Sequence, residues 1–284
     1  MMRIFLTGAS GFIGAHAAAR LWEHDVIALT RTPLQSVASH VTNVVAPHTD
    51  VAALRDALAG CDAVLHLAAQ SNAQSAAGAP AECIDSNVTF TTRLAHLASL
   101  EDVPHFVFSS SALVYGTPAV VPITELTPTA PVGVYAASKL AAEVILEQTH
   151  KSVSVLRLFN VFGPGQTGTL IPALIEQFSM GKQPVLQGDG SQVRSFLYVD
   201  DCVDALWSAL DQRHTGTLNI AGHKASILEV ANYVASAMGV VSNPSFGPGR
   251  PNDAPENWAL HNAAFDALGW IPNTPLAAGI ALTV

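Results

Sequence analysis

Thr7-Gly8-Ala9-Ser10-Gly11-Phe12-Ile13-Gly14 is the stretch of this chain that decides the fold. It stands where a short apolar run ends and a helical pattern begins, which is the context that a dinucleotide-binding turn requires. Gly8 allows a sharp turn, Gly11 lets the backbone approach a pyrophosphate, and Gly14 lets the helix pack closely on the strand. The first N–H groups of the helix and its dipole then favour the negative charge of phosphates.

Apolar runs alternate with helical patterns on both sides of this turn. The expected strands are Arg3–Thr7, Val26–Thr30, Asn43–Ala46, Ala63–Leu67, His105–Ser109 and Ser154–Leu158. The expected helices between them are Phe12–Trp22, Val51–Ala59, Ala81–Leu100 and Val134–Thr149. Short strands that are apolar on both faces are typical of a buried parallel sheet. The alternation predicts an α/β fold, a doubly wound parallel sheet of the Rossmann type with helices on both faces.

The pattern changes after Leu158, where residues rich in Gly, Pro and Asn follow. Late helices are expected at Leu170–Met180, Asp200–Leu210 and Ile227–Met238, with a strand at Leu218–Ile220. We expect residues 1–158 with about 192–222 to form a dinucleotide-binding lobe. Residues from about 159–191 with 223–284 should form a smaller, mixed C-terminal lobe that binds the substrate, with a cleft between the two lobes.

The composition excludes several classes of protein. The 284 residues are 49% hydrophobic and 12% charged, with a net charge of −9 and no basic run, so nucleic acid is not an expected partner. No apolar stretch reaches the roughly 18 residues that span a membrane. Cys61, Cys83 and Cys202 are widely separated and form no CxxC pattern, so we expect neither disulfides nor a metal site. Reduced thiols favour a cytoplasmic protein.

The residues after the second strand indicate which dinucleotide binds. An acidic side chain there binds the ribose 2′-hydroxyl of NAD, whereas an arginine accommodates the 2′-phosphate of NADP. This chain reads Leu29-Thr30-Arg31-Thr32, with an arginine and no carboxylate. We therefore expect NADP(H) rather than NAD(H), although Arg31 is also compatible with an ordinary solvated loop residue.

Tyr135 and Lys139 are four residues apart on an expected helix and so lie on one face of it. An ammonium within about 4–6 Å favours the phenolate and can lower the pKa of a tyrosine from about 10 by roughly 1–3 units. Tyr135 could then exchange a proton with an alcohol or a carbonyl. The strand that ends in Ser109-Ser110-Ser111 supplies a hydroxyl for the same substrate oxygen, and we select Ser111 for this role. A Tyr-x-x-x-Lys spacing alone would favour a solvent-facing pair, because the match is common by chance.

Taken together, these motifs resemble the extended short-chain dehydrogenase/reductase family, in its nucleotide-sugar epimerase/dehydratase/reductase branch. The likeness covers nearly the whole chain. Besides the motifs above it includes His66-Leu67-Ala68-Ala69, Ser109 to Gly116, Leu156 to Pro164, Gly188 to Arg194, Tyr198-Val199-Asp200-Asp201 and Arg250-Pro251-x-Asp253.

The resemblance implies roles for particular side chains. It implies that Ser111, Tyr135 and Lys139 are catalytic. The cofactor-binding residues that we expect are Gly8, Ser10, Gly11, Phe12, Ile13, Gly14, Arg31, Leu67, Ala68, Asn87, Ser109, Tyr135 and Lys139. It implies that Asn160, Arg194 and Arg250 surround the substrate diphosphate and sugar together with Ser111, since arginines neutralise phosphates through charge-assisted hydrogen bonds.

The departures from the family pattern narrow the reaction. Dehydratases of the family carry an Asp-Glu pair where this chain has Ser110-Ser111, so elimination of water is not expected. Ser195 replaces the usual aspartate after Arg194. The family's epimerases usually keep tightly bound NAD and the acidic ribose anchor, which this sequence lacks.

The sequence is compatible with three functions. The first is an NADPH-dependent reduction of a 4-keto sugar carried by a nucleotide, with Tyr135 delivering the proton. The alternative is a nucleotide-sugar 4-epimerase with bound NAD, which uses the same catalytic set. The second alternative is a non-catalytic, dinucleotide-binding redox sensor. The resemblance also implies a homodimer formed through a four-helix bundle of Ala81–Leu100 and Val134–Thr149.

Overall fold

The structure is a computed structural model that describes residues 1–249 and 254–284. The chain forms two compact units. Unit 1 comprises Met1–Val114, Pro131–Arg157 and Val203–Leu218, and unit 2 comprises Tyr115–Ala130, Leu158–Cys202 and Asn219–Val284. Residues 115–130 and 192–202 thus group with unit 2, whereas the sequence suggested that they belong to the first lobe. Which ligand each unit binds stays a prediction.

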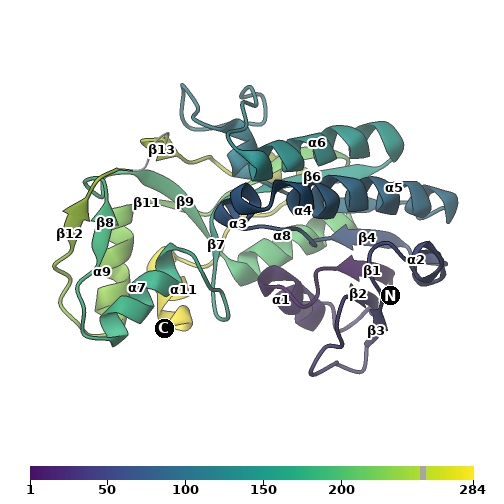
Figure 1. Ribbon diagram of the computed structural model, residues 1–284, viewed down its shortest axis with the longest axis horizontal. Helices are drawn as coiled ribbons and strands as arrows, with labels where there is room; N and C mark the ends of the chain where they lie inside the picture. Colours follow the sequence, from purple (N-terminus) through teal and green to yellow (C-terminus); the bar gives the residue numbers. More distant parts are fainter. Residues whose placement is uncertain (250–253) are drawn as a thin grey trace. The chain divides into compact units, whose positions relative to one another are not determined.

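The main sheet has the strand order of a doubly wound fold (Figure 1). Its strands are β1 (Arg3–Thr7), β2 (Asp25–Thr30), β3 (Val41–Val45), β4 (Ala63–His66), β5 (Phe106–Ser111), β6 (Val153–Leu158) and β10 (Gly216–Ile220). They follow one another in the order β10-β6-β5-β4-β1-β2-β3, and the pairings from β3 through β5 are parallel. The strand order reverses between β1 and β4, where ligands bind in such sheets. The predicted fold class is confirmed.

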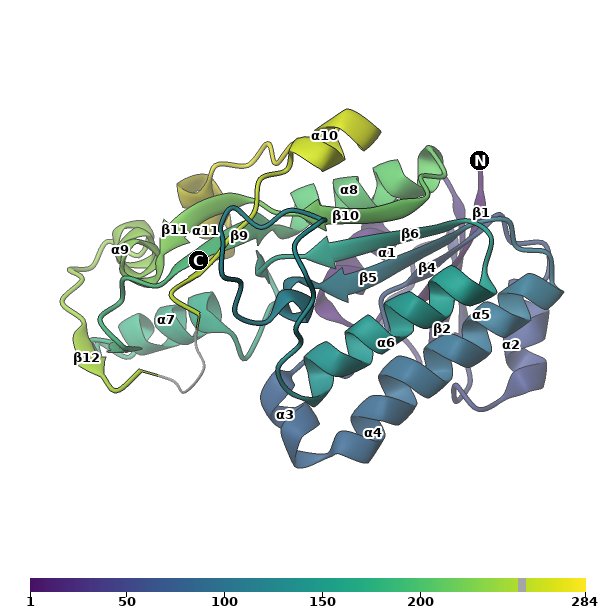
Figure 2. The same cartoon turned by 90° about the horizontal axis from the view of Figure 1, so that it is seen from above.

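Helices cover the sheet and close the core. They are α1 (Phe12–Arg20), α2 (Val51–Leu58), α3 (Ala73–Gly78), α4 (Pro80–Ile84), α5 (Phe90–Leu100), α6 (Val134–Thr149) and α8 (Val199–Asp211). Figure 2 shows α5 and α6 side by side along the sheet, with α2 beyond α5. Every residue of β4 and β5 is buried, and Phe5, Leu54, Leu94 and Phe106 belong to the apolar core between sheet and helices. Burial on both faces explains why these strands read as continuous apolar runs.

The single helix expected over residues 81–100 is divided. A π-helical segment, Asp85–Thr89, separates α4 from α5. A π-segment holds one extra residue in a turn, which the hydrophobic pattern of the sequence does not reveal. A short 3₁₀-helix, Ala112–Tyr115, follows β5.

Unit 2 contains a small mixed sheet, as expected for the second lobe. In it β9 (Val193–Tyr198) pairs antiparallel with β11 (His223–Ser226) and parallel with both β7 (Val161–Phe162) and β13 (Glu256–Asn257). A separate parallel pair joins β8 (Val185–Gln187) and β12 (Ser245–Gly247). The helices are α7 (Leu170–Ser179), α9 (Ile227–Ala237), α10 (Asn262–Leu268) and α11 (Leu276–Thr283). Among residues 1–249 and 254–284, no helix is both long and apolar enough to cross a bilayer.

Candidate active site

The turn between β1 and α1 is tightly packed around its glycines. Gly8 has a φ of +80°, and a Cβ there would lie 2.7 Å from the backbone nitrogen of Ala68. A Cβ on Gly14 would lie 1.9 Å from the carbonyl oxygen of Gly8. Gly14 therefore allows α1 to lie against the turn, and Gly8 allows the turn to lie against residue 68.

The N-terminus of α1 is open at this turn. Gly11 is the N-cap in an extended conformation and provides no side-chain cap, while its N–H donates to the carbonyl of Gly8 at 2.9 Å. Ser10 is exposed, and Phe12 and Ile13 are half-buried. A helix end that carries no side-chain cap presents N–H groups and a positive dipole end to an anion. The turn therefore fits the pyrophosphate of a dinucleotide.

Residues after β4 are held against the same turn. The backbone N–H of Leu67 donates to the carbonyl of Thr7 at 3.3 Å, and that of Ala68 donates to the Thr7 hydroxyl at 3.2 Å. The ends of β1 and β4 are thus tied together, which places Leu67 and Ala68 beside Gly8. The structure therefore brings these three predicted cofactor-binding residues into one place.

His66 connects this turn to the helical layer through a defined tautomer. Its Nδ1 lies 2.6 Å from the Thr7 hydroxyl, and its Nε2 lies 2.8 Å from the Thr91 hydroxyl. Because the Thr91 hydroxyl donates its own hydrogen to the carbonyl of Asn87 at 2.7 Å, it must accept from Nε2–H, which leaves Nδ1 to accept from Thr7. Burial, with the charge of Lys139 as a smaller cause, lowers the pKa of His66 to about 3 and keeps it neutral.

Asn87 lies in the π-helical segment, and its side chain joins two parts of unit 1. Its Oδ1 accepts from the backbone N–H of Gln70 at 2.8 Å, and its Nδ2 donates to the hydroxyl of Ser138 at 2.9 Å. The amide therefore fastens the loop after β4 to α6. Segments of π-helix occur often at functional sites because they turn one side chain out of the regular α-helical register. The expected proximity of Asn87 to a cofactor stays a prediction.

The candidate catalytic residues converge between β5 and α6. Ser111 and Tyr135 share a side-chain hydrogen bond. The buried ammonium of Lys139 donates to the carbonyl of Ser109 at 2.7 Å and lies 4.6 Å from the centroid of the Phe108 ring. An ammonium has three donors, so two remain for a ligand beside the Ser109 carbonyl. The structure thus brings together the three side chains that the sequence selected.

The protonation of this pair differs from the expectation. Burial raises the pKa of Tyr135 to about 12, and the hydrogen bond from Ser111 offsets only part of this rise. The ammonium of Lys139 donates to the carbonyl of Ser109 and does not offset the rise in the pKa of Tyr135. Burial also lowers the pKa of Lys139 to about 8. The expected lowering of the tyrosine pKa by Lys139 is therefore wrong for the protein alone, and Tyr135 is a neutral phenol at pH 7.

Two further predicted residues have contrasting environments. Arg31 lies directly after β2 and is exposed. The hydroxyl of Ser109 is buried and donates to the carbonyl of His66 at 3.1 Å, so it supports the β4–β5 pair. Ser109 is thus engaged inside the sheet, whereas Arg31 is open to solvent.

The predicted substrate-binding residues belong to unit 2. The side chain of Asn160 is exposed and donates to the carbonyl of Ser195 at 2.8 Å. Arg194 is half-buried, and its guanidinium donates to the carbonyl of Ala254 at 2.7 Å. Arg250 lies outside the described residues. These hydrogen bonds from the guanidinium to backbone carbonyls orient the Arg194 side chain. The sequence did not predict them.

The sequence did not predict a buried ion pair in unit 1, on the same helix as Tyr135 and Lys139. Glu143 and Arg157 are buried, with Nη2 of the arginine 2.7 Å from Oε2 of the glutamate. The hydroxyl of Ser110 also donates to Glu143. The only signal in the sequence is that Glu143 follows Lys139 by four residues, which resembles an ordinary exposed helix pair.

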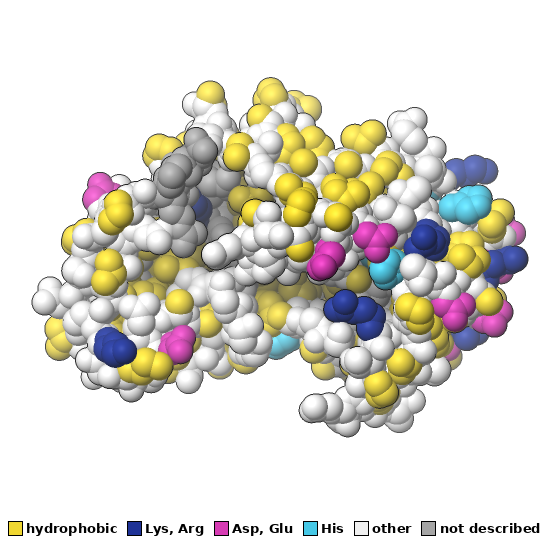
Figure 3. Space-filling view, in the orientation of Figure 1, with side chains coloured by type: hydrophobic (Ala, Val, Ile, Leu, Met, Phe, Trp, Pro, Cys, Tyr) yellow, Lys and Arg dark blue, Asp and Glu magenta, His cyan; other side chains and the backbone are white. Residues whose placement is uncertain are grey.

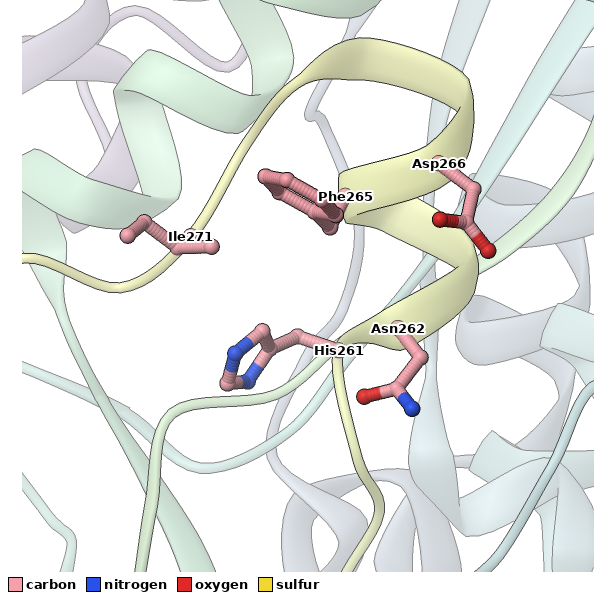
Figure 4. A pocket seen from close by; sticks show the side chains of 5 residues that line it. All are labelled: His261, Asn262, Phe265, Asp266 and Ile271. Atoms are coloured by element: carbon pink, nitrogen blue, oxygen red, sulfur yellow. The ribbon is translucent and has the colours of Figure 1, made fainter.

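Figure 4 shows a pocket elsewhere, in unit 2, around the start of α10. It is lined by His261, Asn262, Phe265, Asp266 and Ile271. None of the residues predicted from the sequence lines it, so it is not part of the candidate active site.

Comparison with known proteins identifies the family. Residues 4–221 match the NAD dependent epimerase/dehydratase family. The chain is 33% identical over 306 residues to a UDP-glucose 4-epimerase of Mycolicibacterium smegmatis, covering 100% of this chain and 97% of that protein.

Solved structures agree with this match. The structure of a UDP-N-acetylglucosamine 4-epimerase from Methanobrevibacter ruminantium, in complex with UDP-N-acetylmuramic acid, has a TM-score of 0.92 at 25% identity and covers 99% of this chain and 96% of that chain. A second similar structure is that of a UDP-glucuronic acid 4-epimerase from Bacillus cereus, a tyrosine-to-phenylalanine variant in complex with UDP-4-deoxy-4-fluoro-glucuronic acid and NAD. Its TM-score is 0.90 at 26% identity, and the match covers 99% of this chain and 97% of that chain. The expected sugar-nucleotide enzyme of the extended short-chain dehydrogenase/reductase type is confirmed at this level, and the chain belongs to the NAD dependent epimerase/dehydratase family.

Proposed function

We propose that this protein is a nucleotide-sugar 4-epimerase that works with bound NAD. The observation that carries the proposal is the Ser111–Tyr135 hydrogen bond, with Lys139 one helical turn away, in the same unit as the glycine turn. The relatives and neighbours described above are 4-epimerases, and one of them contains NAD. These findings favour the epimerase over the 4-keto-sugar reductase that the sequence placed first.

The residues of this chain suit both directions of an oxidation–reduction cycle. Bound NAD supplies a hydride acceptor that can return the same hydride. Tyr135 takes the proton of the sugar 4-hydroxyl while C4 loses its hydride, and gives the proton back once the 4-keto sugar has turned its other face. Ser111 hydrogen-bonds the same oxygen and holds it against the phenol. Lys139 keeps two N–H donors beside the Ser109 carbonyl, and these would hold the ribose of the cofactor.

The high pKa of Tyr135 is consistent with this cycle. In the protein alone the phenol keeps its proton to a pKa of about 12, so it is poised to act as an acid. To act as a base it requires additional positive charge nearby, which an oxidised nicotinamide provides. The phenol is therefore expected to ionise only when the complete site is assembled.

Elimination of water is disfavoured by the hydroxyls that replace the acid and base of dehydratases. The hydroxyl of Ser110 is occupied by Glu143, and that of Ser111 pairs with Tyr135. Neither serine can serve as a carboxylate base for removal of the C5 proton. The buried Glu143 is itself bound by Arg157 and is thereby withdrawn from such a role.

The assay that tests the function uses the purified chain without added cofactor. UDP-, dTDP- and GDP-hexoses are supplied in turn, and the interconversion of the C4 epimers is followed by NMR. We expect turnover with one of them, and a deuterium placed at C4 should be retained in the product. Stoichiometric consumption of NADPH with a 4-keto sugar nucleotide, without epimer interconversion, would instead establish the reductase.

The roles of the two units follow from the same proposal. Unit 1 binds the dinucleotide through its glycine turn, and unit 2 binds the nucleotide sugar with Asn160, Arg194 and Arg250. NADP(H) in place of NAD(H) stays a prediction that depends on Arg31. Localisation in the cytoplasm likewise stays a prediction.

We also propose a homodimer through the outer faces of α4, α5 and α6. Ile84 is 43% exposed and Val144 is 54% exposed, and Ala137 is an exposed residue of the same face of α6. Figure 3 shows hydrophobic side chains gathered over these helices. Light scattering should give twice the monomer mass, and Val144→Glu should lower it to the monomer value because a charge would be buried at the contact. Val241→Glu, at an exposed site in unit 2, is the control.

A further inference from the structure

Three consecutive serines of β5 are each tied to a different turn of α6. Ser111 shares a hydrogen bond with Tyr135, the Ser109 carbonyl accepts from Lys139 at 2.7 Å, and the Ser110 hydroxyl donates to Glu143. The three α6 residues are spaced by four, so they lie along one face of the helix. The proposed reaction uses the first two ties only, which leaves Glu143 without a role.

Glu143 is buried on α6 and bound on both carboxylate oxygens. It is 2% exposed, and Arg157 binds both of its carboxylate oxygens, with Nε 3.1 Å from Oε1 and Nη2 2.7 Å from Oε2. Arg157 itself is 7% exposed and belongs to β6. A carboxylate that is bound by an arginine fork and a hydroxyl has little freedom to move.

The three buried charged side chains of this cluster carry a net positive charge. Lys139 and Arg157 are cations and Glu143 is the anion that follows Lys139 by one helical turn. The titratable groups that interact with the Lys139 ammonium are the Cys83 thiol of α4, the neutral His66 of β4 and Glu143 of α6. Glu143 is thus the one carboxylate among these groups, in a place where burial opposes a charged ammonium.

We propose that Glu143, fixed by Arg157 and Ser110, is a positioning residue that keeps the Lys139 ammonium charged and directed at the β5 carbonyl. This inference rests on the proposed function, because the charge matters for a reaction that needs Lys139 beside Tyr135. Without the carboxylate, burial would favour the neutral amine near physiological pH. The lysine would then lose both its charge and one of its donors.

The pH dependence has a definite direction. Burial lowers the pKa of Lys139 to about 8, and Glu143 raises it against that effect. Glu143→Gln keeps the shape of the side chain and removes the charge, so the pKa of Lys139 should fall further, by about one unit. Activity that needs the ammonium should be lost as pH rises through that pKa, and the loss should therefore begin at lower pH in the variant.

The four lysines of the chain make a direct measurement practical. They are Lys139, Lys151, Lys182 and Lys224, and all except Lys139 are exposed. With ¹³C-labelled lysine, the Cε resonance of Lys139 can be assigned with Lys139→Arg and titrated against three internal references. This readout does not require turnover, so a failure of the proposed function would leave it intact.

We expect the Lys139 midpoint to fall by about one pH unit in Glu143→Gln. Glu147→Gln, the same change one turn further along α6 at an exposed position, should leave it unchanged. In the epimerase assay, the alkaline limb of kcat/KM should move by the same amount as the NMR midpoint. An unchanged Lys139 midpoint in Glu143→Gln would overturn the inference.

A double variant separates electrostatics from folding. Glu143→Gln leaves Arg157 buried without its partner, which destabilises the protein, whereas Glu143→Gln with Arg157→Met removes both charges and should recover much of the Tm. Because loss of the Arg157 cation itself favours a charged Lys139, the Lys139 midpoint is compared only between the original protein and the single variants, and the double variant reports on folding. A Tm that stays low in the double variant would show that the unpaired arginine is not the cause of the lost stability.

Discussion

The β5–α6 region and the loop after β2 belong to the same unit, yet they hold their predicted functional residues in opposite ways. Lys139 is buried at 2% exposure and bound to the Ser109 carbonyl, and Tyr135 is bound to Ser111. Arg31 in the loop after β2 is exposed, and no hydrogen bond or ion pair to its side chain occurs within residues 1–249 and 254–284.

This contrast separates the chemistry from the choice of cofactor. A buried network sets protonation and geometry, and each of its members affects the others when it is changed. An exposed side chain can be replaced with little effect on stability. Substitutions at buried positions of unit 1 should therefore differ in kind from a substitution at the exposed Arg31, and four experiments test whether they do.

The largest effect is expected from Tyr135→Phe. Loss of the phenolic hydroxyl removes the proton-transfer group and should lower kcat by about 10²–10⁴-fold. Affinity for the dinucleotide should be retained because the glycine turn is unaffected. Tyr233→Phe, at a site that is 40% exposed in unit 2, is the matched control. Turnover is measured as epimer interconversion. Unchanged turnover in Tyr135→Phe would show that the buried β5–α6 region takes no part in the reaction.

Gly14→Ala should cause the next largest effect. The added Cβ would lie 1.9 Å from the Gly8 carbonyl oxygen, so α1 must shift away from the turn. We expect the free energy of unfolding to fall by about 1–3 kcal/mol, with weaker dinucleotide binding. Gly78→Ala, where a Cβ would meet nothing within 4 Å, should be neutral or slightly stabilising. Urea unfolding and fluorescence titration measure both quantities, and equal behaviour of the two variants would contradict the packing argument.

The buried histidines of unit 1 should make the protein less stable in acid. Burial lowers the pKa of His66 to about 3 and that of His105 to about 4, from an ordinary value of 6.5. Below pH 6.5 the unfolded chain binds protons that the folded chain cannot, so the free energy of unfolding falls as pH decreases from about 6.5 to about 4. His105→Gln should flatten this dependence in urea unfolding, whereas the exposed His96→Gln should not. If the free energy of unfolding depended on pH equally in both variants, the buried histidines would not be the cause of the acid sensitivity.

The smallest effect on stability is expected at Arg31. Arg31→Asp should change the free energy of unfolding by less than about 0.5 kcal/mol. If Arg31 contacts a 2′-phosphate, the variant should bind NADP about tenfold more weakly, since a hydrogen bond to a charged group contributes about 1.5–3 kcal/mol. Binding of both cofactors can be measured by calorimetry, with the exposed Gln35→Asp as a loop control. Unchanged affinity for NADP would make Arg31 an ordinary solvated residue.

Local signals explain how much of the fold could be predicted. The strand at Arg3–Thr7 and the helix at Val134–Thr149 occur with the expected bounds. Both depend on hydrophobic periodicity and on glycines at the ends, which are properties of neighbouring residues. The short strands of unit 2, such as β8 and β13, were not predicted because they contain only two or three residues and form through distant partners.

The site was predictable where it depends on spacing, and unpredictable where it depends on burial. Tyr135, Lys139 and Ser111 were selected by motif and converge in the structure. The raised pKa of Tyr135 and the Glu143–Arg157 pair follow from the packing of α6 against β5 and β6. No local pattern reports how much water a side chain loses on folding.

The π-helical segment at Asp85–Thr89 determines which way the side chains of two helices face. Its extra residue shifts the angular phase of α4 relative to α5 by about one residue step, or roughly 100°. Deleting a single residue there would restore one continuous α-helix but rotate the Asn87 amide away from Gln70 and Ser138. The irregular turn therefore costs regular helical hydrogen bonds and in return positions one amide for two contacts.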